Sequence, residues 1–221
     1  MIDRVWAVVV ARAGAAAKTR LGGVLSQPER TLLARAMLAD VLDVCGRTCG
    51  LVDGTVLVAD DAARDLGSRA SVVVRDPGLG DMNAAVRAGV AAAQERGATT
   101  VVVLPGDIPS ICSSDLAAIV CAAGAAPRAV VVGASHDRQG TNALLLRPSH
   151  VIGPAFGPPS VDRHLSAARA AGALSRLVSD LGLSRDVDTA ADLANLLDAR
   201  VGVNTASALR HLAGRAVAAF I

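Results

Sequence analysis

The sequence predicts an α/β fold in which helices cover both faces of a mostly parallel, mixed central sheet. Short apolar runs rich in valine alternate with longer stretches in which apolar residues recur at helical spacing. Strands and helices that alternate in this way are joined by right-handed crossovers, which place helices on both faces of the sheet. A chain of 221 residues fits one core, so we expect a single domain over residues 1–221.

The first expected strand covers residues 5–10, a continuous apolar run that is typical of a central strand buried on both faces. A loop of residues 11–21 follows this strand. Ser26 and Glu29 then show the spacing of a capping box, and the amphipathic pattern of a helix continues from there to Leu42.

Strands and helices alternate along the rest of the chain. The other expected strands cover residues 54–58, 70–74, 99–104, 129–133 and 143–146. The other expected helices cover residues 62–66, 82–96, 115–123 and 161–171, and a further helix starts after the cap residue Thr189. Residues 202–221 are expected to add a small helical appendage to the domain.

Composition and charge exclude several classes of protein. Aromatic residues make up 1% of the chain and the formal net charge is +2 without a cluster of Lys and Arg, which argues against a nucleic-acid partner. Charged residues interrupt every apolar stretch before the roughly 18–20 residues that a membrane-spanning helix needs. The first residues enter a strand-like run without the pattern of a signal peptide, so we expect a cytoplasmic protein.

The cysteines and histidines lack the close spacing of zinc ligands, so we expect reduced thiols and ordinary surface or core imidazoles. These residues are Cys45, Cys49, Cys112, Cys121, His136, His150, His164 and His211.

Acidic residues stand at two positions that suit a divalent cation. Asp107 follows the apolar strand of residues 99–104, at the sheet edge where open α/β folds bind ligands, and its carboxylate suits Mg²⁺. Asp186 and Asp188 are spaced to point to the same side of an extended segment, and one of them could share the ion. Alternatively, Asp107 only forms a turn and Asp188 only starts the helix after Thr189.

The loop after the first strand suits a phosphate group. Small residues 13–17 precede Lys18 and Arg20, so two cationic side chains can reach a ligand beside a backbone without bulk. The loop lacks the glycine and lysine spacing of a P-loop. A solvated basic loop is the alternative interpretation.

Three further loops offer polar groups to a ligand. Residues 76–83 lead into a helix and place Asn83 where its amide could contact a nucleobase, although Asp81 or Asn83 could equally cap that helix. Residues 140–143 and 156–160 combine glycines with hydroxyls, and such loops bind phosphates or carboxylates.

Several motifs together resemble the 2-phospho-L-lactate and phosphoenolpyruvate guanylyltransferase family of deazaflavin coenzyme biosynthesis, and the resemblance covers nearly the whole chain. Each motif is short, but their order and spacing together are specific. The motifs are residues 17–21, Leu25-Ser26 with Glu29-Arg30, and residues 37–40, 105–109, 140–144, 156–158 with Ser160 and His164, and 186–189.

The resemblance implies a GT-A-like, Rossmann-like nucleotidyltransferase fold, with GTP as co-substrate, Mg²⁺ as cofactor and a phosphorylated three-carbon acid as acceptor. It implies that Asp107 and Asp188 bind the metal, and that Thr141, Gly157 and Ser160 bind the acceptor. Lys18 and Arg20 are expected to neutralise phosphate charge beside Asp107 in catalysis. The expected nucleotide-binding residues are Arg12, Gly14, Lys18, Asn83 and Gly106.

Two positions depart from the family pattern and leave the acceptor open. Residues 138–141 form a shorter loop than the doubled Gly-Thr of many relatives, and Arg12 replaces a lysine, which changes the donor geometry. Phosphoenolpyruvate, 2-phospho-L-lactate and 3-phosphoglycerate all remain candidates, and a homodimer is compatible with the apolar positions near the C-terminus. The alternatives are a related enzyme acting on a molybdopterin or sugar phosphate, and a non-catalytic nucleotide-binding domain.

Overall fold

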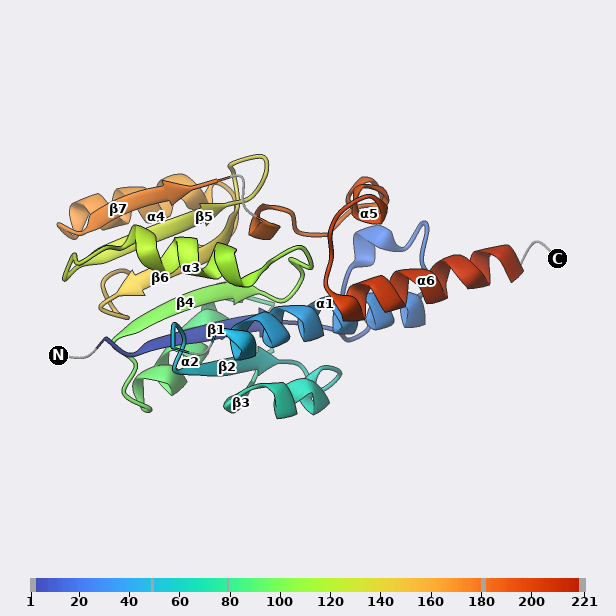
Figure 1. The fold of residues 1–221 in the computed structure, drawn as a ribbon, viewed down its shortest axis with the longest axis horizontal. Coiled ribbons are helices and arrows are strands. Elements are labelled where there is room, and N and C mark those ends of the chain that lie inside the picture. Colours follow the sequence, from blue (N-terminus) through green and yellow to red (C-terminus); the bar gives the residue numbers. More distant parts are fainter. Residues whose placement is uncertain (1–2, 49, 79, 180–181, 219–221) are drawn as a thin grey trace.

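A mixed sheet forms the centre of the computed structural model, which describes residues 3–48, 50–78, 80–179 and 182–218 (Figure 1). Within these ranges the sheet has seven strands in the order β3-β2-β1-β4-β6-β5-β7. The strands are β1 (Val5–Ala11), β2 (Gly54–Ala59), β3 (Val72–Arg75), β4 (Thr100–Pro105), β5 (Ala129–Ala134), β6 (Thr141–Arg147) and β7 (Leu174–Val178).

One strand makes the sheet mixed. β6 runs antiparallel to both β4 and β5, whereas β1 pairs in parallel with β2 and β4, and β5 pairs in parallel with β7. Residues 135–140 join β5 directly to β6, and so short a connection can only return the chain antiparallel. The predicted mostly parallel, mixed sheet is confirmed.

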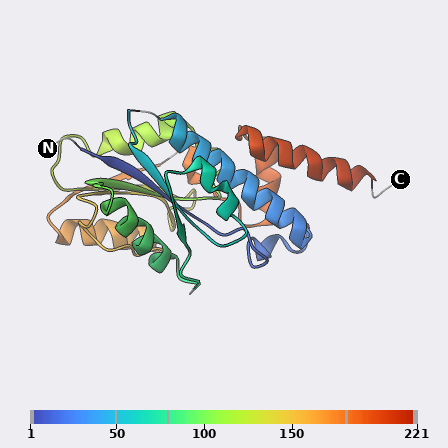
Figure 2. The same ribbon diagram turned by 90° about the horizontal axis from the view of Figure 1, so that it is seen from below.

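Helices cover both faces of the sheet, as predicted (Figures 1 and 2). α1 and α3 pack on one face, where Val9 is buried, and α2 and α4 pack on the other face, where Val8 is buried. This alternation explains why the first strand is apolar at every position. The helices are α1 (Gln27–Arg47), α2 (Met82–Gln94), α3 (Ser113–Ala122), α4 (Ser160–Ala170), α5 (Ala190–Leu197) and α6 (Val203–Ala218), with 3-10 turns η1 (Thr19–Leu21), η2 (Arg64–Arg69) and η3 (Gly182–Ser184).

Some elements differ from the sequence prediction. The strand β7 was not predicted, because its residues are half-buried or exposed at the sheet edge and form no apolar run. The helix expected at residues 62–66 is the 3-10 turn η2, and α1 continues to Arg47, beyond the expected end at Leu42.

The cysteines of the described residues carry free thiols. Cys45 is buried, and desolvation raises the pKa of its thiol to about 12, so this thiol is inert at neutral pH. Cys112 and Cys121 are free and exposed, and Cys49 lies outside the described residues.

The helix α6 lies in the predicted appendage and extends past the sheet (Figure 1). Its first turn is anchored by Asp40 of α1, whose buried carboxylate accepts hydrogen bonds from the backbone N–H groups of Asn204 (3.0 Å) and Thr205 (2.8 Å). A third apolar cluster joins α1, α5, α6 and the first loop, and it contains Leu21, Leu25, Leu33, Met37, Val187, Leu196 and Leu209.

Among the described helices, none combines the length and apolar character needed to cross a membrane.

Candidate active site

A cavity of about 980 Å³ opens at the sheet edge where β4 ends and β6 begins. Because β6 is antiparallel, its first residue, Thr141, lies at the same edge as the end of β4. A smaller hollow of about 250 Å³ continues the cavity under the first loop, and the two share Asp107 and Asp188.

Most of the predicted site residues line one of these two spaces. Arg20, Asn83, Thr141, Gly157 and Ser160 line the larger cavity. Arg12, Lys18 and Gly106 line the smaller hollow.

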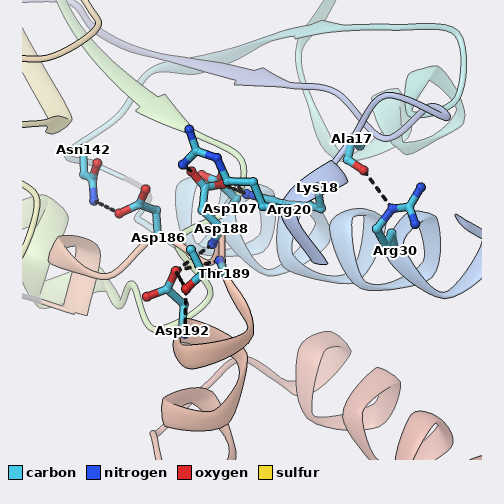
Figure 3. Close-up of polar contacts among 10 residues, drawn as sticks. All are labelled: Ala17, Lys18, Arg20, Arg30, Asp107, Asn142, Asp186, Asp188, Thr189 and Asp192. Carbon is cyan, nitrogen blue, oxygen red and sulfur yellow. Dashed lines mark hydrogen bonds and ion pairs between the residues drawn. The ribbon is translucent and has the colours of Figure 1, made fainter. Parts of the chain in front are cut away.

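Lys18 connects the two predicted metal ligands (Figure 3). Its ammonium group donates a hydrogen bond to Oδ2 of Asp107 and another, of 2.9 Å, to Oδ1 of Asp188. The backbone of Lys18 is left-handed, with φ of 52°, which turns the side chain inward so that only 8% of it is exposed. Arg20 lies 3.7 Å from Asp188 and is 74% exposed, so its charge is available to a ligand.

The ionisation of Lys18 follows from these contacts. Burial alone would lower the pKa of its ammonium group, but the charges of Asp107 and Asp188 outweigh burial, and the pKa is raised. Lys18 is therefore a permanent cation between two carboxylates.

A third carboxylate completes the acidic cluster (Figure 3). Asp186 and Asp188 both line the larger cavity, as do the residues between Ser184 and Thr189, and Val187 also belongs to the third apolar cluster. Burial, and then the charge of Asp107, raises the pKa of Asp186, and this carboxylate accepts a 3.1 Å hydrogen bond from Nδ2 of Asn142.

The cluster has the chemistry of a divalent-cation site. Oδ1 of Asp107 is buried and has no hydrogen-bond partner in the described ranges. Carboxylate oxygens are the donors that a hard cation such as Mg²⁺ prefers. No group of three or more His, Cys, Asp or Glu side chains in those ranges is arranged to hold a metal ion. A cation at this place would therefore take further ligands from bound phosphates, as Mg²⁺ commonly does.

The rest of the first loop is held by acidic side chains that directly follow β2 and β3. Nε of Arg12 donates to Asp76 at 2.5 Å, and Asp60 accepts the N–H groups of Ala13 and Gly14, the latter at 2.8 Å. Burial would raise the pKa of Asp76, but the hydrogen bond from Arg12 and the positive charge of Arg12 help to lower this pKa. The pair is therefore ionised. These contacts fix the loop that carries Lys18.

Gly106 sets the distance between the strand end and its neighbours. A Cβ atom on Gly106 would lie 2.6 Å from Cβ of Ala11, which is closer than carbon atoms pack. The N–H group of Gly106 donates to the carbonyl of Val10 at 2.9 Å. Gly106 thus has a packing role that holds Asp107 beside the first loop.

The predicted acceptor residues form a buried hydroxyl pair beneath a loop. Oγ of Ser160 donates to Oγ1 of Thr141 at 2.9 Å, and the same Oγ1 lies 3.1 Å from Nδ1 of His164. Gly157 has a φ of 97°, which glycine adopts without strain and which exposes its backbone to the cavity.

Two side chains clamp the loop that contains Gly157. Oδ1 of Asn83 accepts from the N–H of Phe156 at 2.7 Å, and Nδ2 donates to the Phe156 carbonyl at 3.3 Å. Arg163 donates to the carbonyls of Ala155 (3.2 Å), Phe156 (3.3 Å) and Gly157. The amide of Asn83, expected to contact a nucleobase, thus holds the loop that contains Gly157 in this structure.

Sequence reasoning missed four residues of this site: Asp60, Asp76, Asn142 and His164. The first two follow the ends of β2 and β3 at the ligand-binding edge, which is the signal that identified Asp107. Asn142 stands within the quoted motif of residues 140–144. His164 also stands within a quoted motif, but its role could not be read from the sequence, because its hydrogen-bond partners Thr141 and Ala155 lie in two other segments of the chain.

Comparisons with known proteins place the chain among guanylyl transferases. A family model described as guanylyl transferase CofC like matches residues 6–216. The chain is 38% identical over 178 residues to a phosphoenolpyruvate guanylyltransferase of Conexibacter woesei, with 80% of each chain covered. It is 34% identical to a 3-phospho-D-glycerate guanylyltransferase of Phenylobacterium zucineum, over 95% of this chain and 97% of the relative.

Solved structures show the same fold. A structure from Desulfovibrio desulfuricans G20, described as a nucleotide-diphospho-sugar transferase, matches with a TM-score of 0.75 over 95% of both chains. The sequence identity is 18%, so the likeness concerns the fold alone. It confirms the nucleotidyltransferase fold that the sequence motifs implied.

Proposed function

The chain belongs to the CofC-like guanylyl transferase family, and from this membership we propose that it transfers GMP from GTP to a phosphorylated three-carbon acid in coenzyme F420 biosynthesis. One observation of the structure supports this function above the others. The acidic cluster and the hydroxyl pair of Thr141 and Ser160 line one cavity, so a nucleotide triphosphate and a small acid can meet there.

In the proposed reaction, an oxygen of the acceptor phosphate attacks the α-phosphorus of GTP. A new phosphorus–oxygen bond forms, the bond from the α-phosphorus to the bridging oxygen breaks, and pyrophosphate leaves with that electron pair. The attacking oxygen is already anionic, so the step needs no general base. Positioning and electrostatic stabilisation then supply most of the acceleration.

Asp107 and Asp188 would hold Mg²⁺, with Asp186 beside them. When bound, Mg²⁺ supplies positive charge to the phosphate oxygens and offsets the charge that develops on the leaving group. Lys18 keeps the two carboxylates together, and the exposed Arg20 adds charge at the mouth of the site. In this proposal, Arg12, Gly14 and Gly106 serve the nucleotide by shaping the first loop and the strand end around it.

Thr141, Gly157 and Ser160 would bind the acceptor. Relatives named for phosphoenolpyruvate and for 3-phospho-D-glycerate are 38% and 34% identical to this chain, so both acids, with 2-phospho-L-lactate, are the substrates to test. These acids differ by small groups, and such differences are often worth only about 1–3 kcal/mol when apolar packing decides between them.

The test incubates the protein with GTP, Mg²⁺ and each acid in turn, and measures pyrophosphate and the guanylylated acid. We expect product with one or more of the three acids, and less with ATP, CTP or UTP. Turnover of a molybdopterin or a sugar phosphate in place of these acids would contradict the proposal. Magnesium-dependent GTP binding without turnover of any acceptor would instead indicate a non-catalytic nucleotide-binding protein.

A further inference from the structure

His164 lies directly beneath the proposed acceptor site and is fully buried on α4. Its Nε2 accepts a 2.9 Å hydrogen bond from the backbone N–H of Ala155. A ring nitrogen that accepts a hydrogen bond carries no proton, so the proton of the neutral ring is on Nδ1. The ring stays neutral at physiological pH, because burial, and then the charge of Arg163, lowers its pKa to about 4.

This tautomer sets the direction of the next hydrogen bond. Nδ1 lies 3.1 Å from Oγ1 of Thr141, so the ring donates and the threonine oxygen accepts. The edge of Phe156 packs near the ring, with centroids 5.1 Å apart and planes at 71°, which restricts rotation of the imidazole. Thr141 therefore does not donate its own hydroxyl proton to His164.

The two hydroxyls then leave one proton for a ligand. Thr141 and Ser160 carry one hydroxyl proton each and share a single 2.9 Å contact, which uses one of them. The remaining proton can point into the cavity, whichever hydroxyl carries it. Ser160 also lies 3.5 Å from the carbonyl of Gln139, which is too long to compete strongly.

The opposite tautomer would reverse this result. A proton on Nε2 would face the N–H of Ala155, and Nδ1 would then accept the proton of Thr141. Ser160 would donate to Thr141, and the pair would offer the cavity only lone pairs. An anionic acid needs donors, so such a site would repel it.

We propose that His164 is a positioning residue that, as the Nδ1–H tautomer, makes the Thr141–Ser160 pair a hydrogen-bond donor to the anionic acceptor. The inference rests on the proposed function, because it assumes that an acid binds at this pair. It adds a role for a residue that touches neither substrate.

Two variants separate this role from a structural one. In His164→Asn the side-chain amide reaches the position of Nδ1 and can still donate to Thr141, but the N–H of Ala155 loses its acceptor. In His164→Gln the amide oxygen reaches the position of Nε2 and can accept from Ala155, but the donor to Thr141 is lost. The melting temperature, the KM for GTP and the KM for the acid are measured for both variants and the wild type.

We expect the more stable of the two variants to bind the acid more weakly. His164→Gln should melt higher than His164→Asn but raise the KM for the acid about tenfold, because Thr141 then loses the donor that holds its oxygen and leaves its own proton directed at the acid. His164→Asn should stay within about threefold of the wild-type KM, and the KM for GTP should hardly change in either. The proposal would be overturned if the less stable variant, His164→Asn, had the higher KM for the acid.

The ring tautomer is measured on the wild type without substrates, from ¹⁵N chemical shifts, with the His164→Asn spectrum assigning the signal. A protonated Nδ1 and an unprotonated Nε2 are expected, and the reverse pattern would overturn the inference whatever the activity. If the tautomer is as expected but the wild type converts no phosphorylated acid, the proposed function fails and the hydrogen-bond assignment stands.

Discussion

A lysine between two carboxylates controls the charge of this site. Lys18 is nearly buried and pairs with Asp107 and Asp188, which come from separate parts of the chain. Without it, two carboxylates would face each other beside Asp186, and their repulsion would oppose folding. A divalent cation bound at this cluster, as proposed, would offset the same charges, so we expect Lys18 and the cation to have partly interchangeable roles for stability.

Replacing Lys18 with methionine tests this relation. We expect Lys18→Met to lower the free energy of unfolding by about 1–3 kcal/mol, less than for a fully buried pair because Asp188 is 44% exposed. Millimolar Mg²⁺ should raise the melting temperature of the variant more than that of the wild type. Equal shifts in both proteins would contradict the relation, and Lys18→Arg serves as the control that keeps the charge.

The buried His164 predicts a loss of stability in mild acid. Its pKa is lowered from 6.5 to about 4 on folding, so the unfolded chain binds the proton first as the pH falls. This shift contributes fully to the free energy of unfolding above pH 6.5. About 3 kcal/mol of that contribution is lost as the pH falls from 6.5 to 4. Urea unfolding across this range should show a smaller decrease for His164→Gln, and an unchanged slope would contradict the assignment.

At the scale of elements, the sequence predicted the features that depend on a local pattern of residues. Continuous apolar strands, the capping box of Ser26 and the position of Asp107 at a strand end all follow from residues close in the chain, and the structure has them. The edge strand β7 carries no such pattern. Its position depends on pairing with β5, which the residues of β7 do not encode by themselves.

Contacts between distant segments could not be predicted from the sequence. Arg12 and Asp76 are 64 residues apart, and Asn83 and Phe156 are 73 apart, so only the folded chain shows that these side chains hold loops. The predicted catalytic, metal-binding, nucleotide-binding and acceptor-binding roles all stay predictions, for Arg12, Gly14, Lys18, Arg20, Asn83, Gly106, Asp107, Thr141, Gly157, Ser160 and Asp188. The geometry adds for Asn83 that its amide is hydrogen-bonded to the backbone of Phe156, in the loop that contains Gly157.

The docking of α6 depends on one buried carboxylate. We expect Asp40→Ala to cost about 1–3 kcal/mol, because the N–H groups of Asn204 and Thr205 lose a charged acceptor. Hydrogen exchange should accelerate in the first turn of α6 and stay slow in β1. Exchange that accelerates equally in both would contradict a local anchor, and Asp61→Ala removes an exposed carboxylate as the control.

At the scale of the whole molecule, the fold brings an acidic cavity to anionic substrates. Of the described residues that line the larger cavity, Asp81, Asp107, Asp137, Asp186, Asp188 and Asp192 carry acidic groups, whereas Arg20 and Arg185 carry fixed positive charge. Such a cavity would repel a nucleotide triphosphate and a phosphorylated acid together. The balance of charge therefore supports a reaction that requires a divalent cation.

The most direct test of this account replaces one atom at the centre of the cluster. Asp107→Asn keeps the size of the side chain and removes its charge. With GTP, Mg²⁺ and phosphoenolpyruvate, 2-phospho-L-lactate or 3-phosphoglycerate, we predict that release of pyrophosphate falls at least about 100-fold, since the charge stabilisation supplied with the cation is worth several kcal/mol. Circular dichroism should show a folded protein, with a melting temperature lowered only by the loss of one of the two carboxylate partners of Lys18. A folded Asp107→Asn protein that releases pyrophosphate at the wild-type rate would contradict the central claim that Asp107 holds the catalytic cation.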